Sequence, residues 1–405
     1  MNYKQILKEL YSLESVTFKQ TLASMRILLK KLNNPEKRLR CIHVAGTNGK
    51  GSVCAMLNSI LSNASYKVGM YTSPHLKKFN ERIRINDKLI SDKDIVKYYL
   101  RVKKYATNQT FFEITTAMAF LYFKEKKVDF AIIETGLGGR LDSTNVITPL
   151  ISIITNVGVE HTEYLGNTLE KIAYEKAGII KKNVPVVTAA EAIALATIKK
   201  KSNNRNSKLI IINRNKIKIY CNKNYISFDI NSYKNLKLDN LNGSFQIENV
   251  AIAVKTIDTL EKFYNIKINN KNIINGLKKV NWPGRFQFIG KNILIDSAHN
   301  PLAFKILIKE LKNLKYQRLI LLVGFSDDKD IKTISRIIGS LANKVIITKS
   351  DSIKAEKPKI IQKYFNTNSI IINNPKKALK YAKNIASKKD LILITGSIFL
   401  VGELI

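Results

Sequence analysis

The fold is decided by CIHVA (41–45), which runs directly into GTNGKGS (46–52). The first stretch is a short apolar run typical of a buried strand, and the second is rich in glycine. From Ser52 onward, apolar residues return at the spacing of a helix with one buried face. Strand, glycine turn and helix in this order predict a loop whose backbone N–H groups bind phosphate at the start of the helix.

Lys50 lies within this loop, where its ammonium group can neutralise the β- and γ-phosphates of a nucleotide. The loop departs from the strict Walker spacing: Val44 stands where that motif has glycine, and Gly51 separates Lys50 from Ser52. The strand before it and the helix after it still favour phosphate binding over a glycine-rich turn with a solvated lysine.

Short apolar runs alternate with helical patterns on the C-terminal side of the loop. Strands are predicted at 67–71, 130–133, 151–155 and 185–188, with helical periodicity between them. This alternation predicts an α/β fold with a parallel sheet covered by helices on both faces. Between 208 and 240 the pieces KLIIIN, KIKIYCN and NYISFDI, separated by Asn and Lys turns, predict a small antiparallel sheet.

The chain of 405 residues is too long for one ordinary core, so we expect two domains. The segment NWPGRFQ (281–287), whose Pro and Gly break regular structure, is the candidate linker. Beyond it, strand-like runs alternate with helical patterns again. Residues 1–284 are predicted to form a P-loop-type parallel sheet domain with a small antiparallel subsheet at about 208–240. Residues 285–405 are predicted to form a smaller Rossmann-like α/β domain.

Composition excludes several classes of protein. With 45% hydrophobic and 24% charged residues, the chain is neither disordered nor a membrane bundle. The three cysteines (Cys41, Cys54 and Cys221) are far apart and lack CxxC spacing, which indicates neither a disulfide framework nor a zinc site. The N-terminal residues lack the continuous apolar core of a signal peptide. We therefore expect a cytoplasmic protein.

The formal net charge is +37, from 68 Lys and Arg against 31 Asp and Glu. Such a balance is typical of proteins that bind nucleic acid, but here the lysines are spread along the chain among frequent Asn residues. There is no zinc-finger spacing, no aromatic RNA-binding motif and no isolated basic tail. We interpret the charge as a solvated basic surface that suits polyanionic small substrates, with neither nucleic acid nor membrane as a partner.

Polar residues follow four more of the predicted strands, at the sheet edge where open α/β folds bind ligands. The segments are TSPHL (72–76), ETGLGGRLDSTN (134–145), NVGVEHTEYLG (156–166) and DSAHNP (296–301). Three of the four histidines, His75, His161 and His299, fall in these segments.

Their clustering beside a phosphate loop predicts a nucleotide and metal site. Glu134 and His161 are candidate Mg²⁺ ligands, although histidine is unusual for so hard a cation. Arg140 is a candidate partner for a phosphate or a carboxylate.

These motifs together resemble the folylpolyglutamate synthases, including those bifunctional with dihydrofolate synthase, within the Mur ligase superfamily. The resemblance covers nearly the whole chain and is specific in order and spacing. It rests on HVAGTNGKGS, YTSPHL with ERIRIN, FFEITTA, ETGLGGRLDSTN, HTEYLG, EKAGIIK, QIENVAIA, WPGRFQ, DSAHNP and ITGSIFLVGE.

The resemblance implies roles for individual residues. Ser73 and Glu134 would hold one Mg²⁺, Glu134 and His161 would hold a second, and Lys176 matches a lysine that such enzymes carbamylate. The implied catalytic residues are Lys50, Glu134, His161 and Lys176. The implied ATP contacts are Asn48, Gly49, Lys50, Gly51, Ser52, Asn249, Arg285, Asp296 and His299. The implied pteroate and folate contacts are Thr110, Phe111, Phe112, Glu113, Leu141, Asp142 and Ser143.

The implied reaction is ATP-dependent amide formation. A carboxylate of dihydropteroate or tetrahydrofolate would be phosphorylated by ATP, and the amine of L-glutamate would then displace phosphate. Mg²⁺ and Lys50 would stabilise the transferring phosphoryl group. Relatives suggest a monomer whose partners are dihydropteroate, reduced folates, L-glutamate and ATP.

Two departures from the family pattern concern the substrate pocket and the loop of the metal histidine. The stretch that usually reads like GLERM is TLASM (21–25) here, and it borders the pteroate pocket in relatives, so folylpolyglutamate synthase activity alone stays an alternative. Glu160 stands where relatives usually carry Asp before the metal histidine. Less favoured alternatives are a UDP-muramoyl peptide ligase, a P-loop switch or transport ATPase, and a basic nucleic-acid-binding module.

Overall fold

The structure, a computed structural model, describes residues 1–13, 21–222, 225–230, 233–365 and 369–405. The chain forms two compact units. The first takes in residues 1–75, 79–240 and 246–280, and the second takes in residues 76–78, 241–245 and 281–405.

The first unit is built on an eight-stranded sheet with β1 near its centre. The strand order is β4-β3-β2-β5-β1-β6-β7-β8; the six strands from β2 to β8 in that order pair in parallel, and β3 and β4 add an antiparallel edge. The strands are β1 (Cys41–Ala45), β2 (Val68–Tyr71), β3 (Ile83–Ile85), β4 (Lys88–Leu89), β5 (Phe130–Glu134), β6 (Ile151–Ile154), β7 (Val186–Thr188) and β8 (Leu209–Ile211).

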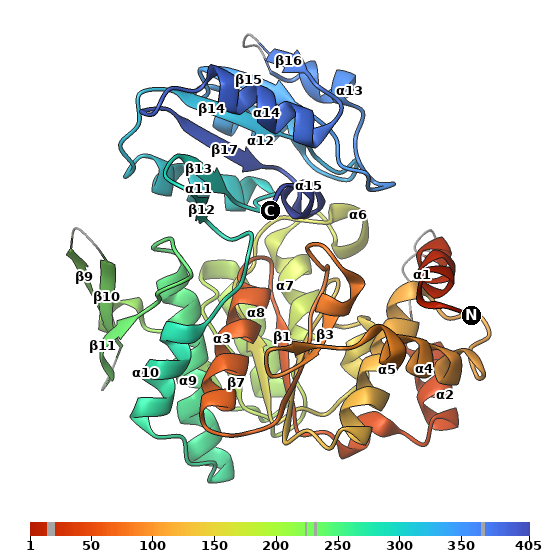
Figure 1. The fold of residues 1–405 in the computed structure, drawn as a ribbon. Coiled ribbons are helices and arrows are strands. Elements are labelled where there is room, and N and C mark those ends of the chain that lie inside the picture. Colours follow the sequence, from red (N-terminus) through yellow and green to blue (C-terminus); the bar gives the residue numbers. More distant parts are fainter. Residues whose placement is uncertain (14–20, 223–224, 231–232, 366–368) are drawn as a thin grey trace. The chain divides into compact units, whose positions relative to one another are not determined.

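Helices cover both faces of this sheet, as the alternating pattern predicts. Figure 1 shows α3, α9 and α10 beside one another, and α3 contacts both of the others. Because neighbouring residues of a strand point to opposite faces, Cys41, His43 and Ala45 share the face away from α3. The helices are α1 (Tyr3–Ser12), α2 (Ala23–Lys31), α3 (Lys50–Asn63), α4 (Asp92–Lys103), α5 (Phe111–Glu125), α6 (Thr162–Leu165), α7 (Leu169–Ala177), α8 (Ala192–Asn204), α9 (Gln246–Tyr264) and α10 (Asn270–Lys279).

A separate three-stranded antiparallel sheet forms within the predicted range of 208–240. Its strands are β9 (Ile217–Asn222), β10 (Tyr225–Ile230) and β11 (Tyr233–Lys237), in the order β11-β10-β9. The piece KLIIIN does not join it: β8 pairs in parallel with β7 and extends the main sheet. The crossover through α8 explains the difference, because a strand that returns after a helix pairs in parallel.

The second unit has a six-stranded sheet in the order β12-β13-β17-β14-β15-β16, parallel except for β12. Its strands are β12 (Gln287–Ile289), β13 (Ile293–Ile295), β14 (Leu319–Val323), β15 (Lys344–Ile347), β16 (Ser369–Ile371) and β17 (Leu391–Thr395). Its helices are α11 (Pro301–Leu311), α12 (Ile331–Gly339), α13 (Pro358–Gln362), α14 (Pro375–Ile385) and α15 (Ile398–Leu404).

The predicted fold class is confirmed: a large, mainly parallel α/β unit with a small antiparallel sheet, and a second α/β unit. The predicted boundary at 284/285 falls inside the WPGRF segment and stays a prediction. Among the helices that the structure describes, none is both long and apolar enough to cross a bilayer.

Candidate active site

The phosphate loop joins β1 to α3, and two of its glycines are required by close approach. Gly46 has φ +147°, and a Cβ there would lie 1.9 Å from Thr155 Oγ1. Gly49 has φ +83°, and a Cβ there would lie 2.4 Å from Asn249 Oδ1. Gly49 is the N-cap residue of α3. Because glycine has no side chain, no capping side chain accepts from the first N–H groups of the helix. A helix N-terminus of this kind is a ready anion site.

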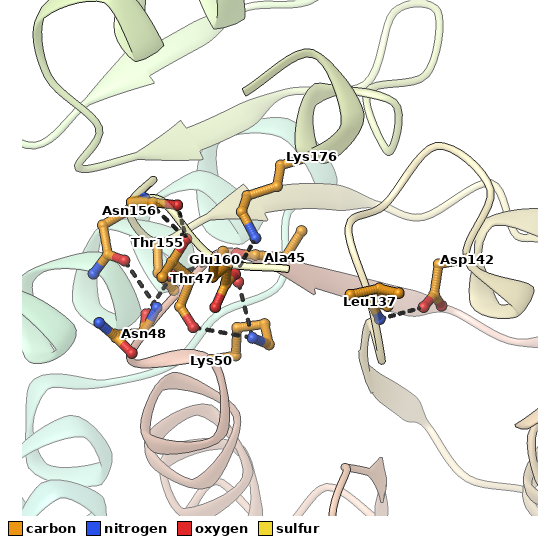
Figure 2. Close-up of polar contacts among 12 residues, drawn as sticks. Ala45, Thr47, Asn48, Lys50, Leu137, Asp142, Thr155, Asn156, Glu160 and Lys176 are labelled. Carbon is orange, nitrogen blue, oxygen red and sulfur yellow. Dashed lines mark hydrogen bonds and ion pairs between the residues drawn. The ribbon is translucent and has the colours of Figure 1, made fainter. Parts of the chain in front are cut away.

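Lys50 is held by the loop it belongs to (Figure 2). Its Nζ donates to the carbonyl oxygen of Gly46 at 2.8 Å and to that of Thr47 at 3.2 Å. These contacts hold the ammonium group against the loop, beside the N-terminus of α3. The predicted phosphate-neutralising lysine is therefore positioned by the loop backbone.

The segment after β6 fixes the loop from the other side. Asn156 accepts from the Thr47 N–H through its backbone oxygen and from the Asn48 N–H through Oδ1, both at 2.9 Å. Thr155 Oγ1 donates to the Asn48 carbonyl at 2.6 Å. Sequence reasoning identified 156–166 as a polar strand end but gave no individual role to Thr155 or Asn156. Their signal was a pair of hydrogen-bonding residues directly after an apolar strand.

Glu134 ends β5, next to β1, and is 4% exposed. Its register partner is Val44, two residues before the phosphate loop. Its Oε2 accepts from the Ser73 backbone N–H at 3.1 Å, so the segment after β2 reaches the end of β5. The structure thus brings together the two residues implied to share one metal ion.

Lys176 and Glu160 form an ion pair inside the first unit. Lys176 is 1% exposed, and its Nζ lies 2.7 Å from Glu160 Oε1. Burial lowers the pKa of Lys176, which Glu160 partly offsets. Burial alone would raise the pKa of Glu160, but the charges of Lys176 and Lys50 outweigh it and lower that pKa to about 2. Figure 2 shows Glu160 between the two lysines.

His161 directly follows Glu160 and is the N-cap residue of α6, with φ +47°. It is one of the charged groups that lower the pKa of Glu160. Glu134 ends β5 and His161 lies in the segment that follows β6, and these two strands flank β1.

The loop after β5 is organised around the buried carboxylate of Asp142 (Figure 2). Its Oδ2 accepts from the N–H groups of Gly136 and Leu137, both at 2.8 Å. Its Oδ1 accepts from Thr144 N at 3.0 Å and Thr144 Oγ1 at 2.5 Å. Arg140 pairs instead with Glu175, its Nε lying 3.0 Å from Glu175 Oε1. The predicted role of Arg140 toward a phosphate or a carboxylate of a ligand stays a prediction.

The N-terminus of α5 forms a capping box. Thr110 N donates to Glu113 Oε2 at 2.8 Å, and Glu113 N donates to Thr110 Oγ1 at 3.2 Å. The Ser24 hydroxyl donates to Glu113 Oε1, and Gln109 Nε2 donates to the Ser24 carbonyl at 3.2 Å. The TLASM stretch therefore contacts the start of the predicted pteroate segment.

Two aromatic residues of this segment contact neighbouring elements. The ring of Phe112 lies 5.8 Å from that of Tyr71, and the Arg82 guanidinium lies 5.0 Å from the ring centre of Phe111. Phe112 also packs on Gly136, where a Cβ would lie 2.6 Å from its ring. The segment at 110–113 and the loop after β5 thus touch each other.

Four predicted ATP contacts are divided between the units: Asn249 belongs to the first, and Arg285, Asp296 and His299 belong to the second. Asn249 lies on α9 beside Gly49 and donates to Gln246 Oε1 at 2.8 Å. In the second unit, Asp296 follows β13 and accepts from Phe286 N and Ala298 N, both at 2.8 Å. Burial raises the pKa of Asp296, and the charge of Arg285 opposes the increase. His299 Nδ1 lies 2.9 Å from the Ser297 carbonyl.

Two family models match this chain. The Mur ligase middle domain matches residues 44–257, and the Mur ligase glutamate ligase domain matches residues 284–398. The chain belongs to the Mur ligase family. A dihydrofolate synthase/folylpolyglutamate synthase of Bacillus subtilis is 34% identical over 95% of this chain and 94% of its own length.

Solved structures of Mur ligases match the fold as well. FolC from E. coli, in complex with DHPP and ADP, has a TM-score of 0.89 and 26% identity, covering 98% of this chain and 96% of its own. A folylpolyglutamate synthase from Thermotoga maritima has a TM-score of 0.82 and 35% identity, covering 99% and 95%. These relatives confirm the folate branch of the Mur ligases as the family predicted from the motifs.

The donor set of this Mur ligase fits a magnesium ion that is completed by its substrate. In the described parts of the chain there is no cluster of three or more His, Cys, Asp and Glu side chains arranged for a metal. The residues implied to bind metal, Ser73, Glu134, His161 and Lys176, offer one hydroxyl, one carboxylate, one imidazole and, on a carbamylated lysine, one carbamate. Mg²⁺ is commonly held by one or two carboxylates together with phosphate oxygens and water, which this set allows.

Proposed function

We propose that this Mur ligase joins L-glutamate both to dihydropteroate and to reduced folates, with ATP and a divalent cation. It is an ATP-dependent ligase of the folate branch, as its similarity to the Bacillus subtilis enzyme supports. The observation that carries the proposal is the juxtaposition of the Lys50 loop, for phosphate, with Glu134 and the Asp142 loop on the next strand. The loop proposed to bind phosphate and the loop proposed to bind the acceptor thus follow adjacent strands of the sheet.

The phosphate loop acts in the first half of the reaction. An oxygen of the acceptor carboxylate attacks the γ-phosphorus of ATP, the bond to the β–γ bridging oxygen breaks, and ADP leaves. Lys50 and the N-terminal N–H groups of α3 bind the phosphates and stabilise the charge on the transferring group. Thr155 and Asn156 hold the loop so that these donors are already oriented. Ser73 and Glu134 would hold one Mg²⁺, and Glu134, His161 and a carbamylated Lys176 would hold a second; the ions would neutralise phosphate charge.

In the second half, the neutral amine of L-glutamate attacks the carbonyl carbon of the acyl phosphate. The new C–N bond forms, the C–O bond to phosphate breaks, and the nitrogen releases a proton. Arg285, Asp296 and His299 are proposed to contact the nucleotide, and Asn249 lies beside Gly49 of the loop that binds it. The pteroate and folate contacts are proposed at 110–113 and 141–143.

Lys176 is proposed to carry a carbamate in the active enzyme. Only the neutral amine reacts with carbon dioxide, and the burial that lowers the pKa of Lys176 favours that form. The product is an anion beside Glu160, which suits a site that also takes up a cation. Crystals grown with bicarbonate are expected to show density for the carbamate on Nζ, whereas a bare amine under those conditions would contradict the assignment.

The chain is further proposed to act in the cytoplasm as a monomer, on small molecules only. Its net charge of +37 suits substrates that carry phosphates and several carboxylates. Duplex or single-stranded nucleic acid is expected to bind weakly and with steep salt dependence, without any effect on ligation. A protein whose turnover required nucleic acid or a membrane would contradict this part of the proposal.

The deciding experiment measures glutamate-dependent ADP release with Mg²⁺ and ATP, offering dihydropteroate and tetrahydrofolate in separate reactions. Turnover with both substrates is expected. Turnover with tetrahydrofolate alone restricts the chain to polyglutamylation and indicates the TLASM stretch as the cause. Release with a UDP-muramoyl substrate alone, or with no acceptor at all, would overturn the folate assignment.

A further inference from the structure

His43 is a buried polar residue in the middle of β1 that no step above uses. Its side chain is 0% exposed, and its Nε2 lies 2.8 Å from Thr144 Oγ1. Its Nδ1 is buried and has no hydrogen-bond partner among the residues that the structure describes. A single contact thus links the strand that leads into the phosphate loop to the segment that follows Asp142.

The contacts of Asp142 indicate which atom donates in the hydrogen bonds Asp142–Thr144 and Thr144–His43. Burial raises the pKa of Asp142, and hydrogen bonds from Gly136, Leu137 and Thr144 oppose that rise. Both of its oxygens act as acceptors for these groups, which favours the carboxylate form. The Thr144 hydroxyl has a single proton, which it donates to Asp142 Oδ1.

That hydroxyl must then accept from His43, which makes the ring a neutral Nε2–H tautomer. Burial, which lowers the pKa of His43 to about 3, agrees with a neutral ring.

The unpaired Nδ1 is a feature that an apolar side chain at this position would not have. A buried acceptor without a donor destabilises the folded state, and an apolar side chain at this position would avoid that cost. The Nε2–H is what an apolar residue cannot supply. It fixes the Thr144 hydroxyl in the orientation that points its proton at Asp142.

We propose that His43 is a positioning residue for the acceptor substrate, because it holds the loop at 136–143 in place through Thr144 and Asp142. The inference rests on the proposed function for the identity of the substrate, dihydropteroate or a reduced folate. Its effect is specific to that loop: the phosphate loop is held by Thr155 and Asn156 and does not depend on this contact. Loss of the Nε2–H therefore raises KM for the acceptor and leaves nucleotide affinity unchanged.

The kinetic test compares variants that remove and keep each donor. His43→Leu and Thr144→Val each remove a link, whereas His43→Gln supplies an amide N–H near the Nε2 position and Thr144→Ser keeps the hydroxyl. The removing variants are expected to raise KM for dihydropteroate about tenfold, with the Kd for ADP within about twofold of wild type. The keeping variants are expected to recover most of the loss.

The double variant His43→Leu/Thr144→Val tests whether the two residues act in one chain. Its KM is expected to match that of Thr144→Val, because residues in one network are not additive. Equal defects in His43→Gln and His43→Leu, or multiplied defects in the double variant, would overturn the relay and leave only a packing role.

A second measurement does not require the enzyme to use folates. With only four histidines in the chain, ¹⁵N shifts of the imidazole nitrogens can be assigned by comparing wild type with His43→Gln. His43 is expected to be the neutral Nε2–H tautomer throughout the range in which the fold is stable. An Nδ1–H tautomer or a charged ring would overturn the inference even with folate turnover intact. The expected tautomer without any folate turnover would overturn the proposed function instead.

Discussion

Two glycine-rich loops follow neighbouring parallel strands of the same sheet, and they use their backbones in opposite ways. In the loop after β1 a cation lies at the centre: Lys50 donates to the carbonyl oxygens of Gly46 and Thr47. In the loop after β5 an anion lies at the centre: Asp142 accepts from the N–H groups of Gly136 and Leu137. The first loop keeps the N–H groups of α3 for a ligand, while the second uses its own N–H groups internally.

This difference decides which loop binds phosphate. A phosphate needs several N–H donors converging on it and a positive charge nearby, which the loop after β1 supplies. A phosphate brought to the loop after β5 would meet the buried carboxylate of Asp142. Both GTNGKGS and ETGLGG are rich in glycine, so glycine content alone does not identify a phosphate site. The charge of the residue that closes the loop identifies it.

The largest expected effect comes from removing the cation of the first loop. Lys50→Ala is expected to lower glutamate-dependent ADP release by about three orders of magnitude or more with either acceptor, because charge on the transferring phosphoryl loses its nearest cation. Among the described residues Lys50 donates to two loop carbonyls, and its charge also lowers the pKa of Glu160, so thermal unfolding should change far less than turnover. Lys199→Ala, an exposed lysine on α8, is the matched control and should turn over like wild type. Wild-type turnover by Lys50→Ala would refute the assignment of this loop.

The first loop was predictable because its contacts are local in sequence. The lysine bonds carbonyls three and four residues before it, so the pattern of strand, glycines, lysine and helix already contained the geometry. The second loop was not predictable in the same way. Asp142 was named for its match to a family, but its link to His43 joins Thr144 to a residue 101 positions away, and no local pattern encodes such a contact.

The same reasoning accounts for the other differences between sequence and structure. The apolar run at 209–211 was expected in the small sheet, because its composition identifies a strand without identifying its partner. Glu160 was noticed only as a departure from the family pattern. Its pairing with Lys176, which lies sixteen residues later and on α7, depends on how that helix packs.

The ion pair behind the first loop should show itself in stability. In protein whose Lys176 is not carbamylated, Glu160→Gln leaves the buried Lys176 ammonium without its carboxylate. Removing one partner of a buried pair typically costs about 3–5 kcal/mol in the free energy of unfolding. In wild type the unfolded state binds a proton at Glu160 below about pH 4.5, and the folded state does so only near pH 2.

The stabilising effect of the pair is therefore complete above about pH 4.5 and is lost as the pH falls toward 2. Denaturant unfolding between pH 3 and 7 is the measurement, with exposed Glu170→Gln as the control. The wild-type and Glu160→Gln curves should converge at low pH. Parallel curves would mean that Glu160 does not carry the pH dependence.

A smaller and more selective effect is expected at the centre of the second loop. In wild type both side-chain oxygens of Asp142 accept hydrogen bonds from the loop. Asp142→Asn leaves only one acceptor oxygen, so part of the loop loses its hydrogen bonds. We expect KM for dihydropteroate to rise by about ten- to a hundredfold, since hydrogen bonds to a charged group contribute about 1.5–3 kcal/mol each.

The affinity for ADP measured by calorimetry should stay within about twofold of wild type, because the first loop is untouched. Asp239→Asn, an exposed residue, is the matched control. An equal loss of ADP affinity in Asp142→Asn would show that the two loops are not separable and would break the comparison.

The smallest effect concerns Ser24, which this chain has within TLASM. Its hydroxyl donates to Glu113 Oε1, while Glu113 Oε2 is used by the capping box of α5. Glu113 is buried but Ser24 is half-exposed, so water can take the place of the hydroxyl that Ser24→Ala removes. A two- to fivefold rise in KM for dihydropteroate is therefore expected, which corresponds to about 0.5–1 kcal/mol. Ser24→Thr keeps the hydroxyl and should restore the wild-type value.

Ser24→Arg places a cation beside Glu113, as the arginine of GLERM-like stretches would, and so tests whether the departure limits the pteroate activity. If the arginine lowers KM for dihydropteroate but not for tetrahydrofolate, the TLASM stretch tunes acceptor choice at the second loop while the first loop serves both acceptors alike. If both KM values move together, Ser24 acts on the stability of α5 rather than on the choice of substrate, since a helix start that is loosened affects every ligand that contacts it.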